Sequence, residues 1–108
     1  MLAGVGDIDE KYEDYMAIIA DDFITQKGIT TVGVWALSGE YVVFKARTYD
    51  QQTDLDQLLK KIFGDKNGGA KDGATGAARL HLGLAGKTPD RESLLKMWKA
   101  LLEQEFVR

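Results

Sequence analysis

The sequence predicts a single α/β domain: a small mixed β-sheet with helices packed on it. Three stretches carry apolar residues at spacings of three and four, a pattern typical of amphipathic helices. Three other runs alternate residue types with a period of two, which is typical of strands. The 108 residues contain no interdomain linker, so we expect one hydrophobic core and the element order α-β-β-α-loop-β-α.

The first predicted helix runs from about Ile8 to Lys27. Its apolar residues share one face because they recur three or four positions apart: Ile8, Tyr12, Met16, Ile19 and Phe23. Asp7 and Glu10 have the spacing of an acidic capping box, and Gly28 is expected to end the helix.

Two strands are predicted next, over residues 29–37 and 41–47. The turn Ser38-Gly39-Glu40 between them is short and contains glycine, which indicates an antiparallel hairpin. Both faces of the hairpin carry apolar residues. We therefore expect it to lie inside a sheet that is covered on both sides.

A second helix is predicted from Thr53 to Phe63, with Thr53 as its cap and an apolar stripe made of Leu55, Leu58, Leu59 and Ile62. The glycine-rich segment 64–76 follows and is predicted to be a loop. A third strand is expected over residues 77–84. The last helix is expected to begin with Thr88 as cap and Pro89 in its first position.

The composition excludes several classes of site. The chain has no cysteine and one histidine, His81, so neither a thiolate nucleophile nor a conventional zinc site is expected. No Ser-His-Asp or HExxH arrangement can be assembled, which argues against a self-sufficient enzyme. The start is acidic and no apolar run could span a bilayer, so we expect a cytoplasmic protein without a membrane partner.

Charge is distributed unevenly along the chain. The net charge of -3 and the isoelectric point of about 5.1 argue against general binding to nucleic-acid backbones. Residues 7–22 carry seven carboxylates and one lysine, whereas residues 60–79 carry five cations and two aspartates. The positive charge is thus concentrated around the glycine-rich segment.

The glycine-rich segment is the main candidate site. It holds five of the 12 glycines, whose backbone N–H groups can approach an anion closely. Together with nearby cations it predicts a phosphate-binding site. The proposed substrate-binding residues are Arg47, Gly68, Gly69, Ala70, Lys71, Gly73, Gly76 and Arg79. The alternative is a surface connection whose glycines only relieve turns.

Two further residues are candidates with plain structural alternatives. Arg47 ends a strand, a place that often lines sites in α/β sheets, but it could equally be a solvated arginine. His81 lies two residues from Arg79 and shares its face. A single histidine without an identified partner is more often a packing or surface residue than a functional one.

Several segments resemble one known domain. They are Ile19–Ile24, Phe44–Thr48, Leu58–Gly64, Gly68–Ala77 and Arg79–Gly83. Together they resemble the C-terminal, DHH-associated domain of the DHH phosphoesterases, whose loop runs roughly Gly-Gly-Gly-His-x-x-Ala-Ala-Gly. The resemblance covers nearly the whole chain.

The resemblance implies the substrate-binding half of a larger hydrolase. In that family a separate N-terminal domain carries Asp-His-His and holds manganese or magnesium; this chain has no such motif, so that domain would be missing. The loop and Arg47 would hold the phosphate of a nucleotide or short oligonucleotide.

Two residues depart from the family pattern. Lys71 stands where the common loop has histidine and Thr75 where it has the second alanine, which leaves the substrate open. By the same resemblance, this associated domain is also found at the end of alanyl-tRNA synthetases, where it contacts RNA and dimerises. The alternative expectation is therefore a stand-alone RNA-binding or dimerisation module, including a homodimer, without hydrolase activity.

Overall fold

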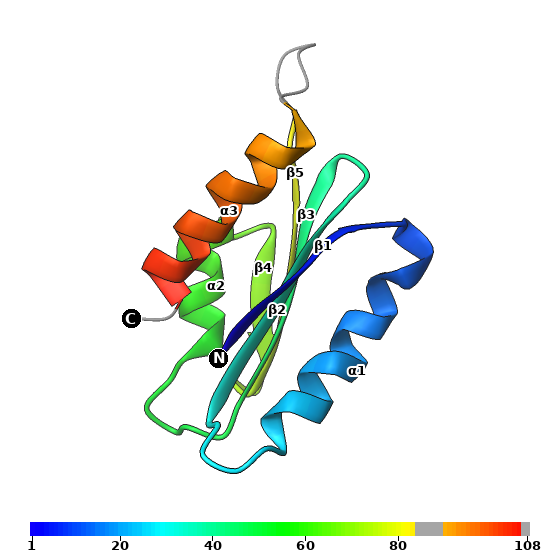
Figure 1. The fold of residues 1–108 in the computed structure, drawn as a ribbon. Coiled ribbons are helices and arrows are strands. Elements are labelled where there is room, and N and C mark those ends of the chain that lie inside the picture. The colour runs from blue at the N-terminus through cyan, green and yellow to red at the C-terminus, as the bar shows by residue number, and fades with distance from the viewer. Residues whose placement is uncertain (84–89, 107–108) are drawn as a thin grey trace.

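A computed structural model describes residues 1–83 and 90–106. Its five-stranded sheet carries helices on both faces (Figure 1). The elements in chain order are β1 (Leu2–Ile8), the 3-10 turn η1 (Glu10–Tyr12), α1 (Glu13–Ile24), β2 (Thr31–Ser38), β3 (Tyr41–Thr48), α2 (Leu55–Phe63), β4 (Gly68–Lys71), β5 (Thr75–His81) and α3 (Arg91–Phe106). The predicted α/β class is confirmed.

The strands lie in the order β1-β2-β3-β5-β4. The predicted hairpin is confirmed as the antiparallel pair β2 and β3. β5 pairs antiparallel with β3, and β4 pairs antiparallel with β5 at one edge. β1 lies parallel to β2 at the other edge, joined to it through α1. The sheet is mixed, as predicted.

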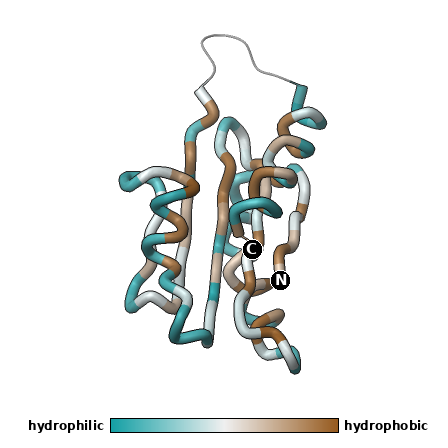
Figure 2. The backbone as a smooth tube through the Cα atoms, turned by 90° about the vertical axis from the view of Figure 1, so that its left-hand side faces the viewer, coloured by the Kyte–Doolittle hydropathy of each residue, from teal (hydrophilic) through white to brown (hydrophobic). Residues whose placement is uncertain are grey.

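The helices form two layers around the sheet. α1 packs over β2 and β3 on one face, where Met16, Ala20 and Ile24 are buried. α2 and α3 cover the opposite face, where the larger core contains Phe44, Leu59 and other apolar side chains. Apolar residues gather along the inner strands, whereas the helices also present hydrophilic residues (Figure 2). As predicted, the hairpin is covered on both sides.

The N-terminus differs from the prediction. The first helix begins at Glu13 rather than Ile8, because residues 2–8 form β1 and Asp9 caps η1 by accepting a hydrogen bond from the Lys11 N–H. The glycines of residues 2–8 interrupt the alternation of apolar and polar residues that would predict a strand. A Cβ on Gly4 would lie 3.0 Å from the indole of Trp35, so the missing side chain makes room for Trp35.

The second helix and the glycine-rich segment also differ in detail. Asp54, not Thr53, caps α2 by accepting from the Gln57 N–H. The segment 64–76 is not a loop throughout: it contains β4 and leads into β5 at Thr75. The third strand, predicted over residues 77–84, starts and ends earlier, as β5 at Thr75–His81. The expected cap Thr88 and Pro89 lie outside the described residues.

A polar contact links the first strand to the last helix. Arg91 of α3 donates to the Asp7 carboxylate at the end of β1 and to the Gly39 carbonyl. The hydrogen bond from Arg91 outweighs partial burial and lowers the pKa of Asp7. Among the described helices, none combines the length and apolar character needed to cross a bilayer.

Candidate functional site

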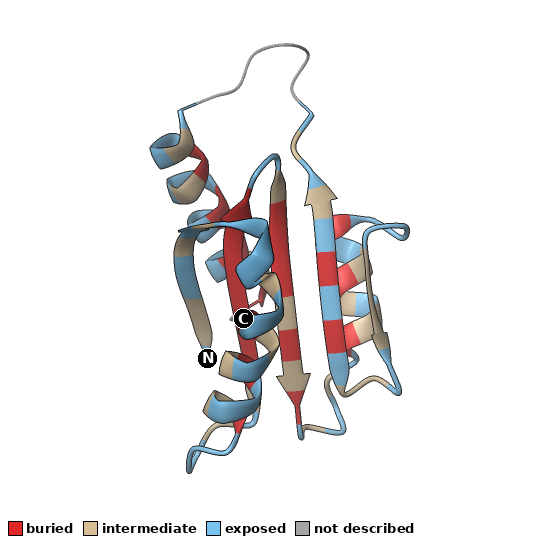
Figure 3. Ribbon diagram, turned by 90° about the vertical axis from the view of Figure 1, so that its right-hand side faces the viewer, coloured by how far each residue is buried: buried red, intermediate tan, exposed pale blue. Residues whose placement is uncertain are grey.

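One part of the sheet has no helix over it. α1 packs on β2 and β3. On the same side of the sheet, the residues of β5 that point away from α2 are exposed. Along β5, residues on this side are exposed and alternate with partly or fully buried residues that face α2 (Figure 3). Strand register defines what we call the open face: Tyr41, Lys45, Arg47, Gly69, Lys71, Thr75, Ala77, Arg79 and His81.

The centre of the open face is shallow because its residues are small. Gly69, Thr75 and Ala77 form the floor of a groove of about 380 Å³, which Ala17 of α1 also lines. Lys45, Arg47 and Lys71 line the same groove and supply three positive charges. We call this part the cationic end of the open face.

Arg47 is held in place by two contacts. Its Nε donates to Asp21 Oδ1 at 2.6 Å, and its guanidinium also donates to the Ala46 carbonyl at 2.8 Å. Only 16% of the Arg47 side chain is exposed, whereas 61% of Asp21 is. The predicted strand-end arginine is therefore anchored at the groove and paired with α1.

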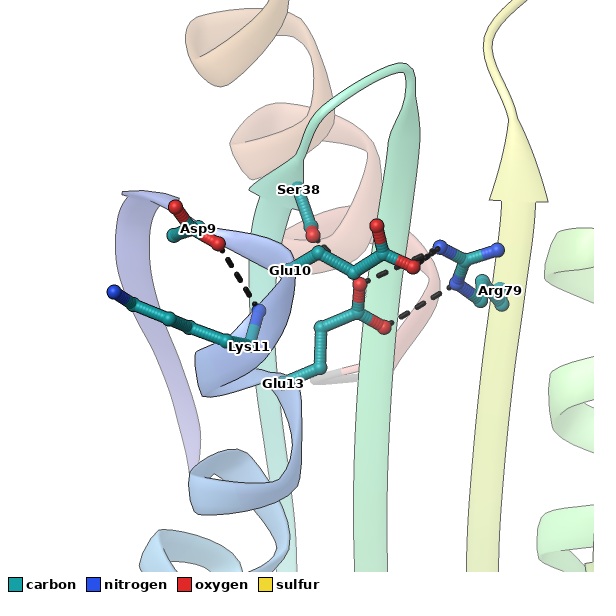
Figure 4. Close-up of polar contacts among 6 residues, drawn as sticks. All are labelled: Asp9, Glu10, Lys11, Glu13, Ser38 and Arg79. Carbon is teal, nitrogen blue, oxygen red and sulfur yellow. Dashed lines mark hydrogen bonds and ion pairs between the residues drawn. The ribbon is translucent and has the colours of Figure 1, made fainter.

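Arg79 occupies the other end of the open face. It donates to Glu13 and Glu10 of the first helical segments, at distances between 3.2 and 3.4 Å (Figure 4). The guanidinium also lies 3.6 Å from the centre of the Tyr41 ring. The hydrogen bond to Glu13 is the main reason that the pKa of Arg79 lies above its ordinary value.

The Glu13 carboxylate accepts hydrogen bonds from two side chains. It accepts a hydrogen bond from the buried Ser38 hydroxyl at 2.6 Å as well as those from Arg79. Burial opposes its ionisation, but these hydrogen bonds and the charges of Arg79 and Lys45 outweigh burial and lower its pKa. Glu13 therefore remains charged at neutral pH.

Lys45 and Lys71 differ from the two arginines. Across residues 1–83 and 90–106, no ion pair engages either ammonium group. Lys71 is exposed at the end of β4 and Lys45 is half-buried on β3. These two charges are available to an external anion.

Most of the predicted glycine positions have structural roles. A Cβ on Gly68 would lie 2.8 Å from the Leu59 carbonyl oxygen, and one on Gly76 would lie 2.6 Å from Leu59 Cδ1. Both glycines therefore allow the strands to approach α2. Gly73 follows Asp72 in the β4–β5 turn, where both residues have positive φ.

The backbone of β4 is also partly occupied within the fold. The Ala70 N–H donates to Asp56 Oδ1 at 2.9 Å, and Lys60 donates to the other oxygen of this carboxylate. The bond from Lys60, followed by that from Ala70, lowers the pKa of Asp56. Asp56 thus occupies one backbone donor of the edge strand, and the Ala70 N–H is not available to a ligand.

His81 lies at the end of β5, on the open face. Its Nε2 is 3.1 Å from Glu40 Oε2, its ring packs edge-on against Tyr41, and half of its side chain is exposed. Among the described residues, no group of three or more histidine, aspartate or glutamate side chains is placed to hold a metal ion.

Sequence reasoning brought together Arg47, Lys71, Arg79 and His81, and the structure places all four on one face. It missed Lys45 and Tyr41 as site residues. Their alternation with Arg47 along one strand was the available signal. The sequence does not reveal that α1 leaves the neighbouring strands uncovered.

Comparisons with known proteins find similarities in sequence and in structure. No model of a known protein family matches the chain. An uncharacterized protein of Methanocaldococcus jannaschii is 34% identical over 96 residues; the match includes 89% of this chain, which spans about a fifth of that relative's length (19%). The C-Ala domain of Aquifex aeolicus alanyl-tRNA synthetase is similar in structure, with a TM-score of 0.57 and 14% identity, over 89% of this chain and 87% of that domain.

The structural similarity corrects the assignment made from the sequence. It relates the fold to a domain of an alanyl-tRNA synthetase rather than to a DHH phosphoesterase. The prediction of a DHH-associated substrate domain, and the hydrolase and phosphoesterase function attached to it, is therefore wrong. At 14% identity the similarity establishes the fold alone.

Proposed function

We propose that this domain binds RNA through the cationic end of the open face. The observation that carries the proposal is the groove beside the uncovered strands, where Lys45, Arg47 and Lys71 surround a floor of small residues. A phosphate backbone could lie on such a floor without displacing bulky side chains. Lysine and arginine are the residues that usually contact phosphate oxygens.

The overall negative charge does not oppose this proposal. Charges interact over about 10 Å at ordinary ionic strength, so the local balance decides binding. Three cations line the groove, and the carboxylates near them are Asp21, which pairs with Arg47, and Glu13, whose pKa the charge of Lys45 helps to lower. The similarity of the fold to a domain of an alanyl-tRNA synthetase supports RNA, and tRNA in particular, as the probe to test first.

The test is a titration of the domain with a transcribed tRNA at several salt concentrations. We expect a dissociation constant in or below the range of about 10⁻⁴–10⁻⁶ M and a steep loss of affinity with salt. The double variant Lys45→Ala/Lys71→Ala should bind more weakly, and its log–log salt slope should be shallower by about 0.7–0.9 for each lost phosphate contact.

The matched control is Lys99→Ala, which removes one lysine from an exposed position of α3 on the opposite side of the sheet. This variant should lose much less affinity than the double variant. The proposal fails if the domain does not bind at about 100 µM, or if Lys99→Ala weakens binding as much as the double variant does.

A further inference from the structure

The Tyr41 end of the open face has a chemistry different from the cationic end. The planar guanidinium of Arg79 lies over the Tyr41 ring at 3.6 Å, and the His81 ring meets Tyr41 edge-on with ring centres 5.0 Å apart. The three side chains come from adjacent strands, since Tyr41 pairs directly with His81 in the sheet. They form one cluster of flat side chains, in which the His81 and Tyr41 rings stand nearly at right angles.

The charge at this end is already neutralised. Arg79 donates to Glu13 and Glu10, and His81 contacts Glu40. A phosphate here would meet the carboxylates of Glu10, Glu13 and Glu40. The unpaired Lys45 lines a hollow with Glu13 and Arg79, but its charge already acts on Glu13. The end is therefore poorly suited to the nucleic-acid backbone.

The same contacts leave a flat surface open. The Arg79 hydrogen bonds use nitrogen atoms at the edge of the guanidinium, and one of its planes rests on Tyr41. The Arg79 side chain is 41% exposed, so it remains accessible from solvent beside Tyr41. Arginine planes and aromatic rings are the surfaces on which proteins stack unpaired bases.

We propose that Tyr41, Arg79 and His81 form a stacking subsite for one unpaired nucleobase. This inference rests on the proposed RNA binding at the cationic end. Arg79 pairs with Val43 in the sheet, two residues along β3 from Lys45, so about 7 Å of strand separates these two positions. A strand whose phosphates contact Lys45 and Lys71 can thus present a base to Arg79. The domain selects single-stranded or looped RNA over continuous duplex, because a duplex buries the faces of its bases.

The test compares a single-stranded RNA and a duplex of equal length, with 2-aminopurine placed at successive positions of the single strand. The wild-type domain should bind the single strand more tightly and should quench 2-aminopurine at one position. Arg79→Lys keeps the charge but removes the plane, so it should weaken single-strand binding at least about fivefold and abolish the quenching. Duplex binding and the salt slope should not change.

A second variant guards against a folding defect. Tyr41→Phe keeps the ring under Arg79 and should retain the quenching, whereas Tyr41→Leu should lose it. Thermal unfolding of each variant establishes that it is folded. Equal binding of single strand and duplex by the wild type, or quenching that survives in Arg79→Lys, overturns the stacking subsite.

The two proposals fail in different ways. If Lys45→Ala/Lys71→Ala weakens both RNAs but Arg79→Lys changes neither, RNA binding stands and the stacking subsite is wrong. If the lysine variant leaves both affinities unchanged, the cationic end is not the RNA site and both proposals are overturned.

Discussion

The glycines between residues 64 and 76 show how one residue type serves different purposes. Gly68 and Gly76 let the sheet approach Leu59 of α2, and Gly69 and Gly76 also line the groove. The sequence predicted one shared role in binding a phosphate. Close packing is the stronger requirement at Gly68, because its neighbour is a backbone atom that cannot rotate away.

The substitution Gly68→Ala tests this role. The added Cβ would lie 2.8 Å from the Leu59 carbonyl oxygen, so α2 must shift, and we expect the free energy of unfolding to fall by about 1–3 kcal/mol. Urea denaturation measures the loss. Gly69→Ala is the comparison, because its nearest contact is the tip of the Asp56 side chain; an equal loss at both positions would contradict the packing role.

Glu13 provides a pH-dependent contribution to stability. Its folded-state pKa lies below the reference value of 4.5, so its stabilising effect is present above pH 4.5 and is lost as the pH falls through the lowered value. Glu13→Gln should reduce the free energy of unfolding at neutral pH by about 1 kcal/mol. The two proteins should converge in acid.

Denaturation curves from neutral to acidic pH check this expectation. Glu10→Gln is the control, because 78% of the Glu10 side chain is exposed and exposed ion pairs contribute little. A difference between wild type and Glu13→Gln that persists unchanged in acid would contradict the assignment.

At the scale of elements, α1 places carboxylates beside the cations of the open face. Glu13 and Asp21 lie eight residues apart on α1 and pair with Arg79 and Arg47. Ala17, midway between them, lines the groove and leaves room above the sheet. The helix therefore anchors both arginines and also competes with a phosphate ligand.

This competition predicts that the loss of a charged side chain increases the affinity for RNA. Asp21→Asn should strengthen RNA binding a few-fold, because removing one unit charge about 4 Å from a phosphate is worth about 1 kcal/mol in water. Stability should change little, since 61% of Asp21 is exposed. The neighbouring Asp22→Asn removes the same charge from a residue that forms no ion pair with Arg47 among the described residues; a similar gain there would mean that net charge, not the groove, sets the affinity.

For the whole molecule, the elements with a regular apolar period could be predicted from the sequence. The β2–β3 hairpin, α2 and α3 follow from alternation and helical spacing. β1 and β4 were missed because their glycines carry no alternating pattern. Those glycines make room for Trp35 and Leu59, and no sequence period reveals these contacts.

The site was predictable to a similar extent. Arg47, Lys71, Arg79 and His81 were identified from charge and position. Their ionic partners were not, because Asp21 lies 26 residues from Arg47 and Glu13 lies 66 residues from Arg79. Only the packing of α1 across part of the sheet brings these groups together and leaves the rest of that face open.

The most direct measurement of the central claim is an NMR titration of the isotope-labelled domain with RNA. We predict amide shifts concentrated on the open face, at residues 44–47 of β3, 69–71 of β4 and 75–79 of β5, with α3 unaffected. Shifts centred on α3 or β1, or no shifts at RNA concentrations near 100 µM (roughly the weak limit of non-specific binding), would contradict the account.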